Sequence, residues 1–528
     1  METPSLTFAP GWQVHLGADL PAADRLPDLG DLGSVAERAL EELGDRPFIR
    51  DTGGGWLSGR EFLDRGRRFA SALAASGVRP GDRVVLTGQN SADFAAAVVG
   101  VFLCGSVLVA ANPAYSDREL AHVVRDSRPA AILCDEELLG RAELLAASLS
   151  PPEPILGPGS ALPLPEGPVR VLSLAKAALL AGNRRSGSSA PGPSWPAMIA
   201  YTSGTTGAPK GALLTHGNLL ASARSVALAW RWSGEDRLLL SLPLFHMHGL
   251  GVGLIGSIFM GSAVILFPRF EPSALAAAIT EERATMFFGV PAMYRRLVGE
   301  PSFAEFARLR LLVSGSAPLP PDLFERIRSV AGAPPVERYG MSETAMNVSN
   351  PFDGARKAGT VGLPLPGVEV AIDSRGEILV RGDNVFDGYL GNPAATAERF
   401  DGGWFRTGDL GSLDADGYLR IEGRSSDLII SGGFNVYPRE VEDQLREHPC
   451  VADAAVVGVP SERWGEEVVA FVVPASESEL DADALRAFAA DLLAPYKVPK
   501  RIFPVESLPR NAMGKVLAYE LRRIAAEI

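Results

Sequence analysis

Two hydrophobic periods alternate along this chain. Residues 59–76, 117–127 and 272–283 place apolar side chains on one helical face, which predicts amphipathic helices. Between and around them stand short apolar runs: RVVLTG (83–88), AAILCD (130–135), ATMFFGV (284–290) and LRLLVSG (309–315). Such runs are typical of strands that helices cover on both faces. The pattern therefore predicts an α/β fold class.

One apolar stretch reaches the length of a membrane span. Leu250 to Phe267 contains 18 residues and no charge, and about 18 such residues mark a candidate span. However, Gly261-Ser262 divides the stretch into a helix-like half and a β-branched half. Residues 100–109 repeat this order of apolar helix end, Gly-Ser and apolar strand. The repeat predicts two similar α/β subdomains and no transmembrane segment.

The composition and hydrophobic pattern of the chain change at further places. Residues 150–168 and 183–196 are rich in Pro, Gly and Ser, which predicts surface connections. After about residue 365, short strands punctuated by glycine (VEVAID, GEILVRG, GYLRIEG) predict a β-rich subdomain.

The tail reads as a separate α+β unit. Helices are expected at 438–448 and 482–494, with the apolar strands AAVVGVP and VVAFVVP between them. We place a domain boundary just after Arg424, which gives a large N-terminal domain of residues 1–424 and a small, mobile C-terminal domain of residues 425–528.

Composition narrows the function classes. Of the 528 residues, 46% are hydrophobic, which excludes general disorder. The formal net charge of −13 argues against a nucleic-acid-binding or anionic-membrane-binding protein. Three separated cysteines give neither a disulfide framework nor a zinc spacing, and residues 1–20 lack the regions of a signal peptide. We therefore expect a cytoplasmic protein.

The first candidate chemistry lies in the loop YTSGTTGAPKG (201–211), which follows a short apolar strand. Glycines let backbone N–H groups turn toward anionic oxygens, hydroxyls add donors, and Lys210 adds charge. The loop is not of the Walker A type, because Pro209 precedes the lysine and Gly211 follows it. A polar flexible turn is the alternative for this composition.

That string resembles the signature of the adenylate-forming superfamily, which includes acyl-CoA synthetases, luciferases and nonribosomal adenylation domains. Further matches follow in the family's order: LPLFHMHG (242–249), SGSAPLP (314–320), RYGMSET (338–344), WFRTGDL (404–410), GRSSDLIISGGFNVYPREVE (423–442) and PRNAMGK (509–515). The resemblance implies that a carboxylate and ATP form an acyl-adenylate and pyrophosphate, and that a thiol then takes the acyl group. ATP, Mg²⁺ and CoA are the implied cofactors and co-substrates.

The resemblance also assigns residues to ATP. Contacts with the phosphates are expected from Thr202, Ser203, Gly204, Thr205, Thr206 and Lys210. Contacts with the rest of the nucleotide are expected from Gly315, Ser316, Ala317, Glu337, Arg338, Tyr339, Gly340 and Met341, and from Ser342 at the α-phosphate. Asp409 and Arg424 would hold the ribose hydroxyls. Glu343 would ligate Mg²⁺, since a hard cation prefers carboxylate oxygen.

By the same resemblance, Lys515 is the catalytic lysine of the small domain. It would offset charge that develops between the carboxylate and the α-phosphate. Because CoA must then approach where Lys515 had been, the small domain would swing near Ser426. The turn containing Gly432 and Gly433 would then line the pantetheine tunnel.

The acyl substrate is predicted from local patterns. His246, together with Ser314, Gly315 and Met341, is expected in the acyl pocket; a metal at His246 and His248 is disfavoured, because no third ligand has a suitable spacing. FGVPAMYRR (288–296) resembles malonyl-CoA synthetases, in which an arginine matching Arg296 pairs with the second carboxylate. A surface position for Arg295 and Arg296 is the alternative.

The tail favours another substrate. RSSDLIISGG (424–433), with Ile430 where malonyl-CoA synthetases carry lysine, is closer to medium- and long-chain fatty acyl-CoA synthetases. The sequence therefore predicts an acyl-CoA synthetase for malonate or a similar small dicarboxylate, with a fatty acid as the alternative substrate. An acyl carrier protein is the alternative acceptor, and a luciferase-like oxygenase shares the motifs. An α/β-hydrolase is disfavoured, because the chain has no G-x-S-x-G.

Overall fold

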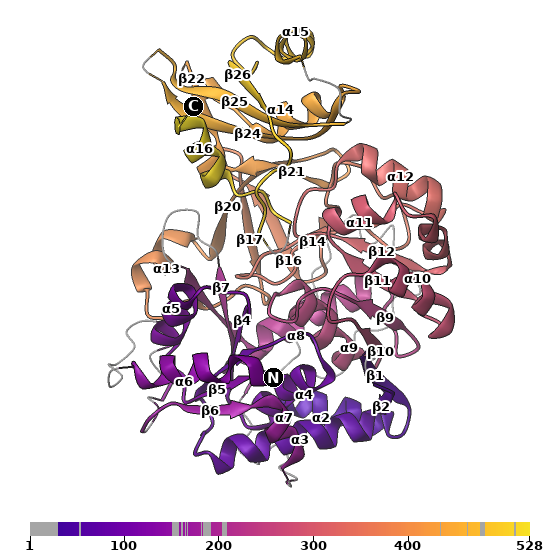
Figure 1. Cartoon of the computed structure of the whole chain (residues 1–528), viewed down its shortest axis with the longest axis vertical. Helices are drawn as coiled ribbons and strands as arrows, with labels where there is room; N and C mark the ends of the chain where they lie inside the picture. Colours follow the sequence, from indigo (N-terminus) through magenta and orange to yellow (C-terminus); the bar gives the residue numbers. More distant parts are fainter. Residues whose placement is uncertain are drawn as a thin grey trace.

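The computed structural model describes residues 30–51, 54–149, 158–159, 162–163, 165, 167–180, 182, 192–202, 209–432, 434–461, 463–475, 481–511 and 514–527. The N-terminal residues 1–29, most of the predicted connection at 150–168 and residues 183–191 of the second connection lie outside these ranges. Figure 1 shows a large body and, at one end of it, a small domain coloured orange to yellow.

A seven-stranded sheet forms the first subdomain, and its central strands are parallel. In spatial order its strands are β18 (Gly388–Tyr389), β8 (Lys210–Thr215), β7 (Pro196–Thr202), β4 (Val107–Ala111), β3 (Arg83–Thr87), β5 (Ala131–Cys134) and β6 (Arg170–Ser173). Helices α5 (Asp117–Ser127) and α6 (Leu139–Ala147) cover one face, where Val85 and Val109 pack against Leu120 and Val124.

A nine-stranded sheet forms the second subdomain. In spatial order its strands are β15 (Leu363–Pro364), β14 (Val348–Ser349), β13 (Val336–Tyr339), β12 (Leu311–Ser314), β11 (Met286–Gly289), β9 (Arg237–Leu240), β10 (Ala263–Leu266), β1 (Pro47–Asp51) and β2 (Trp56–Ser58). Its outer face is covered by α10 (Pro272–Glu281), α11 (Pro291–Leu297), η4 (Pro301–Arg308) and α12 (Pro321–Ala331).

The helices between the two sheets share one core. They are α2 (Leu32–Leu43), α3 (Gly59–Ala75), α4 (Ala92–Leu103), α7 (Leu174–Leu179), α8 (His216–Ala229) and α9 (Ile255–Met260). Side chains of both sheets pack against these helices, among them Val84 from β3 and Phe288 from β11. The prediction of two α/β subdomains that repeat a helix–strand unit is thereby confirmed: α4 leads to β4, and α9 leads to β10.

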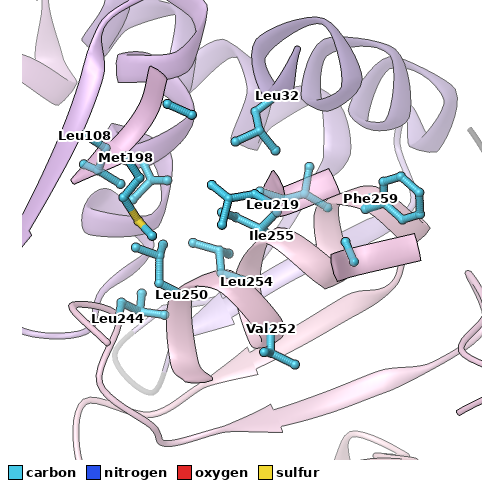
Figure 2. Packing of buried hydrophobic residues seen from close by; sticks show 14 of the residues in the cluster. Leu32, Leu108, Met198, Leu219, Leu244, Leu250, Val252, Leu254, Ile255 and Phe259 are labelled. Carbon is cyan, nitrogen blue, oxygen red and sulfur yellow. The ribbon is translucent and has the colours of Figure 1, made fainter. Parts of the chain in front are cut away.

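Most of the apolar stretch 250–267 lies inside this shared core (Figure 2), whereas Ile265 and Phe267 pack on the outer face of the nine-stranded sheet. It begins in a π-helical segment, η3 (His248–Leu254), continues as α9, and ends in β10. Leu250 faces Met198 and Leu244, and Ile255 lies beside Leu219. No described helix is long and apolar enough to cross a membrane. Burial between two sheets explains why this stretch carries no charge.

The two subdomains exchange strands across the sequence. The nine-stranded sheet takes β1 and β2 from residues 47–58, which precede the whole of the other sheet. In return, the seven-stranded sheet takes β18 from residues 388–389, which follow the nine-stranded sheet in sequence. Each subdomain is therefore completed by a segment from beyond the other.

An antiparallel five-stranded sheet follows, as the short, glycine-punctuated strands after about residue 365 predict. Its strands are β16 (Val368–Ile372), β17 (Glu377–Gly382), β19 (Phe400–Asp401), β20 (Trp404–Leu413) and β21 (Leu419–Arg424), with α13 (Pro393–Arg399) between β18 and β19. The 3-10 turn η5 (Ser425–Asp427) leads from β21 to the small domain. The boundary after Arg424 stays a prediction.

The small domain is α+β. Its sheet contains β22 (Ile429–Ser431), β23 (Phe434–Val436), β24 (Val451–Ser461), β25 (Gly465–Pro474) and β26 (Arg501–Pro504). Helices α14 (Pro438–Arg446) and α15 (Ala482–Leu492) cover one face, and α16 (Ala518–Glu527) covers the other. The helices predicted at 438–448 and 482–494 are thus present, each ending two residues early.

Candidate active site

A cavity of about 670 Å³ lies where the large body meets the small domain. Its walls come from the segments after β11 and β12, from β13 and the turn that follows it, from β20 and β21, and from α14 and β24 of the small domain. The predicted residues that line it are Thr202, Lys210, His246, Arg296, Ser316, Ala317, Glu337, Arg338, Tyr339, Gly340, Met341, Ser342, Glu343, Asp409, Arg424 and Lys515.

Asp409, Tyr339 and Arg424 form one bonded group in the cavity wall. Asp409 and Arg424 are cross-strand partners on β20 and β21, and Arg424 Nε lies 3.0 Å from Asp409 Oδ1. Tyr339 donates its hydroxyl hydrogen to Asp409 at 2.5 Å. Burial, together with the Asp409 charge, raises the pKa of Tyr339 well above its usual range. A fixed, buried carboxylate of this kind is suited to accept hydrogen bonds from two sugar hydroxyls.

Glu343 and Lys210 are linked through Tyr389. Tyr389 on β18 donates its hydroxyl hydrogen to Glu343 Oε1 at 2.9 Å, and Lys210 Nζ lies 5.4 Å from the centre of the Tyr389 ring. Thr202 donates to the Lys210 carbonyl at 3.4 Å. Strand β18 pairs with β8, which explains why a residue so far along the chain reaches this lysine.

Glu343 fits a magnesium site. Its side chain is buried, and this burial raises its carboxyl pKa, a penalty that a nearby cation would relieve. Mg²⁺ is usually held by one or two protein carboxylates together with phosphate oxygens of the substrate. No group of three or more His, Cys, Asp or Glu side chains in the described ranges is placed to hold a metal. One buried carboxylate therefore fits Mg²⁺ that is held jointly with phosphate oxygens of a substrate.

Arg338 lines the same cavity and has an unusual environment. The side chain is only 5% exposed. One Nη donates to Ser316 Oγ at 3.2 Å, whereas Nε has no partner among the described residues. Burial lowers the pKa of Arg338 to about 9, so the guanidinium stays charged at neutral pH. Gly315 makes room for it, because a Cβ there would lie 2.3 Å from Arg338 Nε.

Two neutral histidines stand near this guanidinium. Burial lowers the pKa of His246 to about 4, and burial with the Arg338 charge lowers the pKa of His248 well below its usual range. His248 Nδ1 lies 3.3 Å from Ser316 Oγ. Ser316 adopts a positive φ of 69°, a conformation that is uncommon for non-glycine residues. Neither histidine can balance the Arg338 charge, because an imidazole is either neutral or cationic.

Lys515 enters the cavity from the small domain. It follows Gly514, whose φ is 75°, and its backbone N–H donates to Asn511 Oδ1 at 3.0 Å. Burial and the nearby Arg424 charge lower the pKa of Lys515, while Asp409 opposes that shift. The lysine therefore shares the cavity with the carboxylate expected at the ribose.

Two hydrogen bonds to main-chain oxygens join the large body to the small domain. Arg295 of α11 donates to the carbonyl of Ala452 at 3.1 Å, and Arg439 of α14 donates to the carbonyl of Ile421 at 2.6 Å. Arg296, next to Arg295, is exposed, and its guanidinium lies 5.2 Å from the centre of the Phe270 ring. Of the two arginines weighed from the sequence, Arg295 faces the small domain and Arg296 lies at the edge of the cavity.

Residues 36–390 match the family described as AMP-binding enzyme, and residues 440–515 match the AMP-binding enzyme C-terminal domain. The chain belongs to the AMP-binding enzyme family. This AMP-binding enzyme is an acid–thiol ligase of the AMP-forming acyl-CoA synthetase type, as the order of its motifs predicts.

Several relatives of this AMP-binding enzyme act on different acids. It is 38% identical to a feruloyl-CoA synthase of Amycolatopsis sp over 490 residues, which cover 89% of this chain and 94% of that protein. It is 36% identical to a malonate–CoA ligase of Arabidopsis thaliana over 485 residues, which cover 84% and 78%. ATP-bound MatB from Rhodopseudomonas palustris superposes with a TM-score of 0.85 at 35% identity. The superposition covers 93% of this chain and 98% of the MatB chain.

The structure does not place every predicted residue of the AMP-binding enzyme in the cavity. Ser203, Gly204, Thr205, Thr206 and Gly433 fall outside the described residues. Ser314 is fully buried at the end of β12 and, like Gly315, is not among the side chains that line the cavity. Gly432 also lies away from it, with its N–H bonded to the Trp464 carbonyl at 2.7 Å. Its role in a pantetheine tunnel stays a prediction.

Sequence reasoning missed three side chains in this AMP-binding enzyme. Tyr389 donates a hydrogen bond to Glu343. His248 contacts Ser316. Arg439 lies close enough to Glu337 to lower the pKa of its carboxyl group. Tyr389 and Arg439 stand in stretches that read as a strand end and an amphipathic surface helix. His248 gave a signal, since it shares a motif with His246, but the pattern did not show that it faces Ser316.

Glu337 gives this AMP-binding enzyme a pH-dependent stability. The side chain is 1% exposed, and burial raises its pKa from 4.5 to about 7, with Arg439 opposing this shift and Asp443 of the small domain adding to it. Between these two pH values the folded chain keeps a proton that the unfolded chain releases. The stability contributed by protonated Glu337 is therefore complete below about pH 4.5 and lost as the pH rises through about 7.

Glu337→Gln should remove this dependence, because the amide is neutral throughout. We expect the free energy of unfolding of the variant to exceed that of the wild type by up to about 3 kcal/mol above pH 7, with the difference vanishing toward pH 4.5. Urea unfolding of both proteins across this range measures the difference. Two parallel stability curves would contradict the assignment.

Proposed function

We propose that this AMP-forming acyl-CoA ligase activates a short dicarboxylic acid, malonate or a close homologue, and transfers the acyl group to CoA. The observation that carries the proposal is Arg338: a charged guanidinium, buried in the cavity, with no carboxylate partner in the described part of the chain. Burying a charge without a partner is unfavourable by several kcal/mol. A second carboxylate on the substrate would supply the missing partner.

The surroundings of Arg338 support an anionic ligand. His246 and His248 are neutral at physiological pH, so neither of them competes for the carboxylate or repels the guanidinium. The Ser316 hydroxyl already accepts a hydrogen bond from Arg338, and it has its own hydrogen to donate. We assign Arg296, at the edge of the same cavity, to the attraction of the dianion during entry. The malonate–CoA ligase of Arabidopsis thaliana, at 36% identity, also supports a short dicarboxylate.

The chemistry that we propose joins the first carboxylate of the substrate to ATP. A substrate carboxylate oxygen attacks the α-phosphorus of ATP, a bond to this oxygen forms, and the bond to the bridging oxygen breaks as pyrophosphate leaves. Lys515 offsets the charge of the attacking carboxylate and the α-phosphate, while Lys210 and Thr202 hold the departing phosphates. Glu343 would hold Mg²⁺, which neutralises phosphate charge. The CoA thiolate then attacks the acyl carbon, and AMP leaves.

The alternative substrate is a monocarboxylic acid. The feruloyl-CoA synthase of Amycolatopsis sp is 38% identical, and Ile430 in the hinge region favours a fatty acid, as the tail motif predicts. With such a substrate Arg338 would keep its charge without a partner in the complex. A carrier-protein thiol in place of CoA is a second alternative for the acceptor.

A substrate panel tests the proposal. The purified protein is given ATP, Mg²⁺ and CoA with malonate, methylmalonate, succinate, acetate, octanoate, palmitate or ferulate, and acyl-CoA is quantified. We expect kcat/KM for malonate or methylmalonate to exceed that for acetate by at least about 100-fold, because acetate leaves Arg338 unpaired. Preference for octanoate, palmitate or ferulate would overturn the dicarboxylate. Acyl transfer to an acyl carrier protein but not to CoA would overturn the acceptor.

A further inference from the structure

Helix α5 packs against strands β7 and β8, which flank the predicted phosphate-binding motif at 201–211. We call this pair of strands the phosphate-motif hairpin. Strands β7 and β8 are antiparallel, with Tyr201 opposite Gly211 and Thr202 opposite Lys210. A capping box between Ser116 and Glu119 fixes the start of α5, and Leu120, Val123 and Val124 fasten the helix to the sheet. The helix therefore presents its remaining side chains to the hairpin from a fixed position.

The first contact is made by Asp126. Tyr201, at the end of β7, donates its hydroxyl hydrogen to Asp126 Oδ2 at 2.7 Å, and its hydroxyl lies 3.4 Å from the carbonyl of Val123. The carboxylate makes this a charge-assisted hydrogen bond, which is stronger than one between neutral groups. Tyr201 is the residue directly before Thr202, so Asp126 fixes the backbone at which the predicted phosphate contact begins.

The second contact is made by His122, one helical turn earlier. His122 Nε2 lies 2.7 Å from the carbonyl oxygen of Pro209, the residue directly before Lys210. A carbonyl only accepts, so the imidazole donates and carries its hydrogen on Nε2. The ring also packs edge-on against Tyr201, with 6.2 Å between the ring centres. One helix thus binds both strands of the hairpin, each next to a residue that we assign to the ATP phosphates.

We propose that His122 and Asp126 are positioning residues for ATP: they hold Thr202 and Lys210 at the separation and direction that the β- and γ-phosphates require. This inference rests on the proposed function, which places those phosphates at Thr202 and Lys210. The network extends further on the other side, because Lys210 lies over the Tyr389 ring and Tyr389 bonds to Glu343. The helix would therefore act on phosphate binding and leave the nucleoside end, at Asp409 and Arg424, unaffected.

That difference defines the experiment, which needs no acyl substrate. Binding of ATP with Mg²⁺ and binding of AMP are measured by calorimetry on the whole protein. AMP lacks the β- and γ-phosphates. We expect His122→Ala and Asp126→Ala each to raise the Kd for ATP about 10-fold, and Kd for AMP to change less than about twofold.

Conservative variants and a surface variant serve as controls. His122→Gln keeps an N–H near the Pro209 carbonyl, and Asp126→Asn keeps an acceptor for Tyr201, so both should recover most of the affinity for ATP. Tyr201→Phe, which removes only the hydroxyl, should match Asp126→Ala and add little to it in the double variant. Arg125→Ala, an exposed position on the same helix, should bind both nucleotides like the wild type.

Equal losses for ATP and AMP would overturn the inference, because they would show a general loss of structure. Unchanged ATP binding in His122→Ala, Asp126→Ala and Tyr201→Phe would overturn it as well. If the wild-type protein bound neither nucleotide, both the proposed function and this inference would fall. The wild type could bind both nucleotides while the ratio of the Kd for ATP to the Kd for AMP is the same in every variant as in the wild type. In that case this inference alone would fall.

Discussion

Lys515→Ala should slow acyl-adenylate formation by about 100- to 1,000-fold and leave thioester formation from supplied acyl-adenylate within about twofold of the wild type. Lys515 lines the cavity together with Asp409, Arg424 and Glu343. The first half-reaction brings together a carboxylate and a phosphate, and a cation placed between them acts most strongly as their charge is redistributed. In the second half-reaction pyrophosphate has left, and we expect the small domain to have carried Lys515 away.

The two half-reactions are measured separately, by pyrophosphate exchange and by CoA consumption from synthetic acyl-adenylate. Arg523→Ala is the matched control, because it removes an exposed cation from α16 of the same domain. Equal losses in both half-reactions would contradict this division of work.

Arg338→Met should lower kcat/KM for the dicarboxylate about 100-fold or more, since the substrate carboxylate would be buried without its partner. Activity with acetate or a longer monocarboxylate should be maintained or rise. The unliganded variant should also be at least as stable as the wild type, because a buried charge without a partner has been replaced by an apolar side chain of similar length.

This combination separates a binding role from a structural one. If Arg338 only supported the cavity wall, Arg338→Met would lower the melting temperature and affect all acids alike. Arg328→Met, an exposed position on α12, controls for the loss of one positive charge from the same subdomain. Arg296→Ala should reduce the association rate of the dianion and the salt dependence of that rate. The equilibrium affinity for the dianion should change much less.

Much of the fold could be predicted from the sequence, because the elements that build it carry strong local signals. The helix at 117–127 agrees with α5 at both ends, since Ser116 and Glu119 form a capping box that is visible as a motif. The helix–strand repeat around Gly105 and Gly261 revealed two subdomains. The exchange of β1, β2 and β18 left no such signal, because strand partners far apart in sequence depend on tertiary packing.

The site was predictable in its motifs and unpredictable in its contacts. Asp409, Glu343 and Lys515 stand in strings that resemble a family, and the structure brings them to one cavity. The resemblance assigned Arg338 to the nucleotide, which stays a prediction, but no motif showed that this buried guanidinium has no acidic partner among the described residues. Whether a charge is paired depends on which side chains fold against it, and a single sequence does not show that.

The strand exchange has a consequence for how this protein tolerates being cut. A fragment that ends near residue 230 would contain β1 and β2 without the sheet they pair with, and would lack β18. Its apolar inner helices would face water where η3 and α9 normally lie. We expect such a fragment to aggregate when expressed alone, and fusion partners or split reporters to be accepted only in the connections predicted from the sequence or at the junction with the small domain.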